Sequence, residues 1–436
     1  MPISRTASLF GWSLIIVASL FIVVSSIGTY SLRKFESRVK QLRESGEIPS
    51  LDDLVHVVEN EQDDMKYHLM KVINDNPNLP VTATIPYGKQ GNIIVDTESI
   101  LQFELFQTEH NEIFVNLAKA ANASEASTKV TLDGDHFPIV QAHNLLQFLV
   151  WKGKVLVAKN DGQSACEVAE QLLQIGNKFK RTFLLDTFLA MSLQQSAWDL
   201  VHETAKKGML PDVDLKTLQA IDDLSNCEDN MQIYESIMRS EMAVVTHMML
   251  NPEALPSRAE QNGHEPSHLA SFVNQIPSGA AMVAGNTYLD HMMIAIEHSQ
   301  AQLTEQIGLA EKHYRWNILA AFDGDPLPAY LTFRSRFGEH IAFSRAMRVL
   351  LALHRSADAQ NRDAWPAEYL ASLDLPNEIT LDPFTNEAMI VKRQGETWQV
   401  YSVGSDFEDA GGDAGQDAGV GLTETCQDEP DQENED

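Results

Sequence analysis

One short stretch of the sequence has the residue types and spacing of a zinc site. His264-Glu-Pro-Ser-His268 matches the His-Glu-x-x-His pattern of zinc metalloproteases, in which two His ligands lie one helical turn apart and the Glu activates a water molecule. Pro266 lies between the two histidines and would interrupt the helix that has to hold them on one face. We therefore expect a loop leading into a helix that starts at Pro266. A zinc-dependent hydrolase using His264, Glu265 and His268 is our third and least favoured hypothesis.

A second candidate site is a glycine-rich loop near the carboxy terminus in which aspartates recur. Asp406, Asp409 and Asp413 alternate with glycines, and no Lys or Arg follows Gly404. Calcium takes six to eight oxygen ligands, which carboxylates and the backbone carbonyls of a flexible loop can supply together. The three aspartates are therefore candidate calcium ligands. The alternative is a solvated acidic linker that binds no ion.

The remaining sequence carries none of the common enzyme motifs. A Walker loop, a Gly-x-Gly-x-x-Gly turn after a strand and a Gly-x-Ser-x-Gly elbow are all absent. The adjacent carboxylates Asp222 and Asp223 would point in different directions on a helix, so we interpret them as solvated surface and not as an acid–base pair. We therefore expect a protein that is not an enzyme, with no catalytic residue to name.

The composition predicts a folded body with an acidic surface. The 436 residues include 32 Lys and Arg against 62 Asp and Glu, which gives a formal net charge of −30. Because each phosphate contact needs a cationic side chain, we expect no nucleic acid partner. A hydrophobic content of 44% with 22% charged residues is typical of globular domains. The three cysteines are too few for a disulfide framework.

Residues 1–32 predict a membrane anchor. The run from Thr6 to Leu32 contains no charged residue and is long enough to cross a hydrocarbon core of about 30 Å, so the lipid bilayer is an expected partner. The alternative is a cleaved signal peptide, because Ser26-Ile-Gly28 offers small residues at a cleavage-like spacing. Basic residues after the run favour a cytoplasmic body, whereas the position at the start of the chain is typical of a signal anchor. We favour a single-pass cell-membrane protein with an extracytoplasmic body.

The segment after the anchor, residues 33–96, reads as juxtamembrane helices followed by a short extended stretch. A first helix is expected to continue to Ser45. A second is expected to begin at Ser50, where Ser50-Leu-Asp-Asp53 has the form of a capping box, and to fade near Asn74. Across Val81–Val95, β-branched residues broken by Pro and Gly predict a hairpin-like segment.

The rest of the chain predicts a helical body and a small mixed module. Helical periodicity with short breaks, among them Asn160–Gly162 and Gly208–Asp212, predicts helical hairpins over residues 97–355. Residues 356–412 read as an α+β module with a β-hairpin around Gln394-Gly-Glu396, and residues 413–436 as an acidic disordered tail. The expected fold class is therefore mainly α, with an N-terminal transmembrane helix, a helical-hairpin body, a small C-terminal α+β module and a disordered acidic tail.

The last module of the chain has three notable sequence features: Leu381-Asp-Pro-Phe-Thr-Asn386, the hairpin, and Tyr401-Ser-Val-Gly404 followed by Asp409-Ala-Gly-Gly-Asp413. Together they resemble the carboxy-terminal module of the major pseudopilin of type II secretion systems. In that family an Asp-Pro-aromatic turn leads into a two-stranded unit, and the loop after it binds calcium. The resemblance implies calcium ligands among Asp406, Asp409 and Asp413. The family's processing site lacks its glutamate here, because the nearest match is Gly11-Trp-Ser-Leu-Ile-Ile16.

The whole layout is similar to a group of uncharacterised planctomycete membrane-anchored helical proteins. The likeness comprises the anchor followed by Arg43-Glu-Ser-Gly-Glu-Ile-Pro-Ser-Leu-Asp-Asp-Leu54, the helical middle, and the Asp-Pro-Phe to Tyr-Ser-Val-Gly ending. The group has no assigned activity, so the resemblance implies architecture and an envelope address. Our first hypothesis is an envelope protein that acts as an interaction or scaffold protein with unknown protein partners. The second is a pseudopilin-like component of a secretion apparatus.

Overall fold

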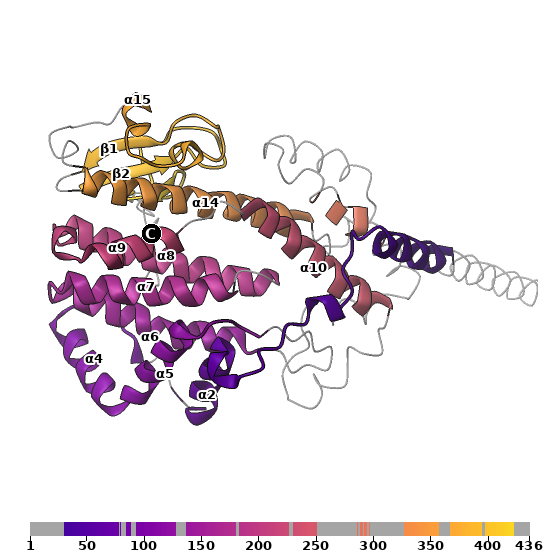
Figure 1. Cartoon of the computed structure of the whole chain (residues 1–436), viewed down its shortest axis with the longest axis horizontal. Coiled ribbons are helices and arrows are strands. Elements are labelled where there is room, and N and C mark those ends of the chain that lie inside the picture. The colour runs from indigo at the N-terminus through magenta and orange to yellow at the C-terminus, as the bar shows by residue number, and fades with distance from the viewer. Residues whose placement is uncertain are drawn as a thin grey trace, which may run out of the picture. The chain divides into compact units, whose positions relative to one another are not determined.

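The computed structural model (Figure 1) describes most of the chain after the first 29 residues. The described residues are 30–77, 79, 84–88, 93–127, 137–179, 183–225, 230–250, 327–356, 367–394 and 397–422, with a few residues between 286 and 296. The predicted transmembrane run therefore lies almost entirely outside them. No helix within the described part of the chain is both long and apolar enough to cross a membrane.

The chain divides into two compact units, and neither is continuous in sequence. The first unit contains the amino-terminal segment and residues 235–331 of the predicted helical body, and the second contains most of the rest of that body, which is what we call the body below, together with the carboxy-terminal module. The first comprises Met1–Val55, Lys129–His136 and Glu235–Leu331, and the second comprises His56–Thr128, Phe137–Tyr234 and Thr332–Asp436.

In the first unit, residues 30–44 form the helix that was predicted to follow the anchor. The helix ends at a left-handed glycine, Gly46 with φ +79°, and the N–H groups of the next two residues donate to the carbonyl of Leu42. Arg38 on this helix forms an ion pair with Asp290 at 2.5 Å. Both the predicted helix and its predicted end are confirmed.

The prediction that a helix begins at Ser50 is wrong. The capping box itself forms, because the Ser50 N–H donates to Asp53 Oδ2 at 3.0 Å and the Asp53 N–H donates to Ser50 Oγ at 3.1 Å. Only a single 3₁₀ turn, η1 (Asp52–Leu54), follows, because the β-branched valines after it favour extended backbone. The next helix, α2 (Met65–Asp75), has its own cap in Asp64 and ends where the sequence predicted.

The second unit is built from helical hairpins, as predicted. Its α6–α7 turn contains Asn160 at φ +61°, and the α8–α9 connection contains Gly208 at φ +70°, so the predicted breaks at these two places are confirmed. The helices of this unit are α2, α4 (Thr97–Glu109), α5 (Asn111–Asn122), α6 (Ile139–Ala158), α7 (Gly162–Phe179), α8 (Leu184–Lys206), α9 (Leu215–Leu224) and most of α14 (Leu327–Arg355), and α10 (Asn230–Leu250) runs on into the first unit.

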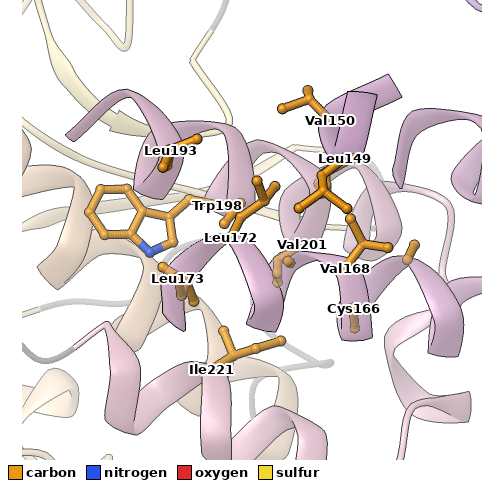
Figure 2. Packing of buried hydrophobic residues seen from close by; sticks show 14 of the residues in the cluster. Leu149, Val150, Cys166, Val168, Leu172, Leu173, Leu193, Trp198, Val201 and Ile221 are labelled. Atoms are coloured by element: carbon orange, nitrogen blue, oxygen red, sulfur yellow. The ribbon is translucent and has the colours of Figure 1, made fainter. Parts of the chain in front are cut away.

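The core of the second unit lies around α7. Figure 2 shows Leu172 and Leu173 of α7 beside Trp198 of α8, with Ile221 of α9 on the adjoining side, and all four side chains are fully buried. Helices α6 and α8 approach closely at Gly153, where an added Cβ would lie 2.4 Å from a methyl carbon of a leucine on α8. These helices therefore form one continuous apolar core.

The carboxy-terminal module contains the predicted hairpin and a third strand that the sequence did not predict. Strands β1 (Ile390–Gln394), β2 (Thr397–Ser402) and β3 (Ala418–Val420) form an antiparallel sheet in the order β1-β2-β3, with Val391 opposite Val400 and Tyr401 opposite Gly419. Short helical turns α15 (Ala367–Leu370) and η7 (Asn377–Thr380) precede them.

The disordered tail predicted from residue 413 is wrong for its first part. Residues 413–422 are ordered and include β3. The sequence did not indicate this strand because glycines are uncommon in strands. Gly419 is required there, because an added Cβ would lie 2.2 Å from the carbonyl oxygen of Val400. Residues 423–436 lie outside the described part of the chain. The mainly helical fold with a small antiparallel sheet is confirmed.

Candidate functional site

The Asp-Pro-Phe turn of the module is built around the buried carboxylate of Asp382. Asp382 is 3% exposed, and its Oδ1 accepts hydrogen bonds from the Phe384 N–H at 2.7 Å and the Ser402 hydroxyl at 2.8 Å. Its Oδ2 accepts the Val403 N–H at 3.0 Å. A buried carboxylate is costly unless donors satisfy it, and here all donors come from the turn and the end of β2. Asp382 therefore joins the turn to the sheet.

Next to this turn, the module contacts α14. Arg345 of α14 donates to the carbonyl oxygen of Leu381 at 2.8 Å. Gly338 lies against the ring of Phe384, where an added Cβ would lie 2.8 Å from Cζ. The aromatic residue of the turn thus packs on a helix that belongs to the same unit.

The loop between β2 and β3 is closed by Asp417, a residue that the sequence interpretation left in the tail. Its carboxylate accepts backbone N–H groups from Ala410 at 3.3 Å, Gly412 at 2.6 Å and Asp413 at 3.1 Å. Burial raises the pKa of Asp417, and these hydrogen bonds oppose the rise. The recurrence of aspartate four residues after Asp413 was the one signal in the sequence that could have identified it.

The three predicted calcium ligands lie in this loop, and each one stabilises a local turn. Asp406 Oδ1 accepts the Glu408 N–H at 3.1 Å, and Asp413 Oδ1 accepts the Gly415 N–H at 2.7 Å. Asp409 Oδ1 accepts the N–H of the glycine two residues later at 2.8 Å. All three are therefore Asx-type turn residues.

Asp409 is also connected to the sheet. The Tyr401 hydroxyl donates to Asp409 Oδ1 at 3.0 Å, and Lys392 donates to the same hydroxyl oxygen. Partial burial opposes ionisation of Asp409, but hydrogen bonds from Gly411 and Tyr401 and the nearby Lys392 outweigh it and hold the pKa of Asp409 below its ordinary value. The carboxylate is therefore ionised at neutral pH.

The loop meets part of what a calcium ion requires. The second carboxylate oxygens of Asp406 and Asp409 accept no hydrogen bond within the described residues, so they are open to a cation. Among these same residues, however, no three carboxylate, imidazole or thiolate side chains gather into a group that could hold a metal ion. Calcium bound here would take further oxygens from backbone carbonyls, and the calcium site stays a prediction.

The His264-Glu-Pro-Ser-His268 motif lies outside the described residues. The zinc hypothesis that depends on His264, Glu265 and His268 therefore stays a prediction.

Asp222, which the sequence interpretation placed on a solvated surface, is buried and paired. It is 6% exposed, and its two oxygens accept hydrogen bonds from Arg348 at 2.9 Å and Arg355 at 3.2 Å. The interpretation is wrong because α9 packs against α14, more than 120 residues later in the chain, while Asp223 remains exposed. Asp222 therefore connects α9 to α14, and Asp223 is a surface residue.

A second buried ion pair joins α2 to α8. Lys66 donates to Asp186 at 3.1 Å, and the Lys66 ammonium lies 5.1 Å and 5.5 Å from the ring centroids of Phe137 and Phe179. Burial raises the pKa of Asp186, and the charge of Lys66 opposes the rise. Sequence reasoning missed this pair because the two charges are 120 residues apart.

Comparisons of the chain with protein-family models, with curated proteins and with solved structures give no match in any of the three.

Proposed function

We propose that this protein is a single-pass envelope protein whose anchor holds it at the cell membrane and whose helical body binds other proteins without catalysing a reaction. The observation that carries the proposal is a pair of leucines on α4, Leu101 and Leu105, each of which is 61% exposed. They lie one helical turn apart, so they form one apolar surface on a helix whose inner side chains are well packed.

The buried charges of the body have partners within the fold. Asp222 is bound by two arginines, and Asp186 is bound by Lys66, so these groups hold helices together. They are therefore engaged inside the fold and are not available to a partner.

Affinity capture of the tagged full-length protein from native membranes tests the proposal. After mild crosslinking, mass spectrometry compares the captured proteins with those from an anchor-only control that ends before residue 50. We expect specific envelope proteins to be enriched by the full-length chain. Equal recovery with the anchor-only control would contradict the proposal, because the body would then contribute no binding.

A second candidate function is a pseudopilin-like component of a secretion apparatus. It is favoured by the Asp382 turn, the hairpin and the loop that Asp417 closes, which together parallel the module that the sequence resembles. This function predicts a calcium ion in the loop held by Asp406, Asp409 and Asp413. It also predicts cleavage after Gly11, visible as a shortened amino terminus by mass spectrometry. An intact amino terminus, or one cut near Gly28, would contradict it.

A further inference from the structure

Helix α4 has apolar side chains on two faces. Phe103 and Phe106 point into the core and are 3% and 7% exposed, whereas Leu101 and Leu105 are 61% exposed. A surface helix of a globular protein has one apolar stripe, which faces its core. The second stripe on α4 therefore lacks a covering element within the described part of the chain, and exposed apolar patches of this kind mark interaction sites.

An open cavity of about 660 Å³, lined in part by Leu105, lies between α4 and the end of α2 with the residues that follow it. The α4 side of the cavity is lined by Gln102, Leu105, Phe106 and Glu109, which follow the i, i+3, i+4, i+7 spacing of a single helix face. Phe106 stacks on Phe148 of α6 with ring centroids 4.5 Å apart, so the inner wall of the cavity is fixed by the core. Figure 1 shows α4 and α2 at the same end of the second unit, on either side of α5.

The rim of the cavity is negatively charged. Asp75 at the end of α2 and Glu109 at the end of α4 both line it, His110 lies beside Glu109, and none of the described lining residues is Lys or Arg. Both carboxylates are exposed, and neither forms an ion pair within the described residues. Glu104, five residues earlier on α4, differs in that it pairs with Lys159. The cavity thus combines an apolar wall with two carboxylates that lack a cation.

We propose that this surface, which we call the α4 groove and define by Asp75, Leu101, Gln102, Leu105 and Glu109, binds a basic amphipathic segment of a partner protein. The segment places a Lys or Arg side chain in the cavity between Asp75 and Glu109 and an apolar side chain on Leu101 and Leu105. The inference rests on the proposed function and names the partner's chemistry. The argument is charge complementarity: the groove is acidic and apolar, so acidic segments are repelled and basic segments are attracted.

The size of the groove agrees with a short segment. Gln102 and Glu109 are seven residues apart on α4, which is about 10 Å along the helix axis. This length matches one or two turns of a bound helix or a few extended residues, with one long side chain inserted.

Selection from a random peptide library tests the proposal. Phage-displayed random 12-mers are selected on the full-length protein in lipid nanodiscs, with empty nanodiscs for counter-selection. We expect enriched peptides to carry Lys or Arg next to apolar residues. Synthetic copies of these peptides should bind the Asp75→Asn/Glu109→Gln variant about tenfold more weakly than the wild type. Raising the salt concentration should lower the affinity less for the variant than for the wild type.

Matched variants separate the groove from general charge and general hydrophobicity. Asp223→Asn/Glu167→Gln removes the same number of exposed carboxylates from other helices and should leave the affinity unchanged. Leu101→Ser/Leu105→Ser should abolish binding, while Leu215→Ser, at a leucine that is 75% exposed on α9, should not change it. Thermal melting of each variant confirms that these surface substitutions leave the fold intact.

Three results would overturn the proposal: no enrichment over empty nanodiscs, enriched peptides without basic residues, or an affinity that does not depend on Asp75 and Glu109. If the groove fails in this way while membrane capture still enriches envelope proteins, the binding surface lies elsewhere and the proposed function stands. If both experiments fail, the interaction role itself is wrong.

Discussion

The helical body and the carboxy-terminal module belong to one compact unit but are held together by different interactions. In the body, large apolar side chains such as Trp198 and Leu172 are fully buried between helices, and charges such as Asp222 are satisfied by arginines from distant helices. In the module, Asp382 and Asp417 organise the chain by accepting backbone N–H groups from turns and loops.

The difference lies in the turns and the loop of the module. The strands of the module bury apolar side chains such as Trp398 and Val400 in the same core as the body, but the Gly-rich loop contributes no buried apolar side chain to it, so buried carboxylates fix the backbone there. The body buries enough apolar area to fix its helices by packing. A substitution in the shared core should therefore reduce the stability of the whole unit, whereas the loss of a carboxylate that holds a turn or the loop should act locally.

The largest effect is expected in the body. Trp198→Ala should lower the free energy of unfolding by about 3–5 kcal/mol, because it leaves a cavity and removes the hydrogen bond from the Trp198 indole N–H to Ser225. Guanidinium unfolding of the full-length protein in mild detergent measures this loss. Leu215→Ala, at an exposed leucine, is the control and should change it by less than about 0.5 kcal/mol. Similar losses in both variants would contradict the assignment of the core.

A smaller and local effect is expected in the module. Asp382→Ala removes the acceptor of the Phe384 and Val403 N–H groups, which should cost about 1–3 kcal/mol. Hydrogen exchange followed by mass spectrometry should show faster exchange in the turn and at the end of β2, with α7 unchanged. If exchange accelerated equally in α7, the module and the body would unfold as one cooperative element, and the comparison would fail.

These two regions also differ in how much of each could be predicted from sequence. The helices of the body and the β1–β2 hairpin follow from local periodicity and turn residues, and so does the stop at Gly46. Strand β3 could not be predicted in this way. Gly419 is needed because the backbone of Val400 lies too close to leave room for a side chain, and only the folded sheet reveals that contact. The role of Asp222 was misjudged for the same reason, since its arginines come from a helix far away in the chain.

The candidate sites were predictable only as residue types. The Asp-rich loop could be located from its composition, but Asp417 as its organiser could not be separated from its neighbours. The α4 groove was missed because Asp75 and Glu109 are distant in sequence and look like ordinary surface residues until the fold brings them to one cavity.

A pH effect is expected at the seam between the body and the module. His202 of α8 has its pKa lowered to about 4 by burial and by the nearby Lys206 and His354, and its Cε1 lies 3.0 Å from where a Cβ on Gly421 would be. Because the unfolded chain binds the proton more tightly, stability is fully present above about pH 6.5 and is lost as the pH falls towards 4.

Between pH 7 and pH 5 this loss should be about 1–2 kcal/mol. Unfolding midpoints at the two pH values measure it for the wild type and for His202→Gln, in which this contribution should disappear. If the variant kept the full pH dependence, other groups would be responsible, and His202 would not couple the two regions.

The smallest effect is expected from calcium, and it should be confined to the module. If the loop binds calcium through Asp406, Asp409 and Asp413, a concentration ten times the dissociation constant stabilises the folded state by about 1.4 kcal/mol. Hydrogen exchange of residues 404–417 should slow, and Asp409→Ala/Asp413→Ala should remove the effect, whereas Asp223→Ala should not. Equal protection in the double variant would place the calcium elsewhere.

The claim that the exposed leucines of α4 form an interaction surface is tested most directly by site-specific photocrosslinking in native membranes. A benzoylphenylalanine replaces Leu101 on α4 in the full-length protein, or Leu215 on α9 as a matched exposed leucine. The α4 groove as an interaction surface predicts a discrete protein adduct from position 101 and none from position 215. Adducts of equal yield at both positions, or none at position 101, would contradict it.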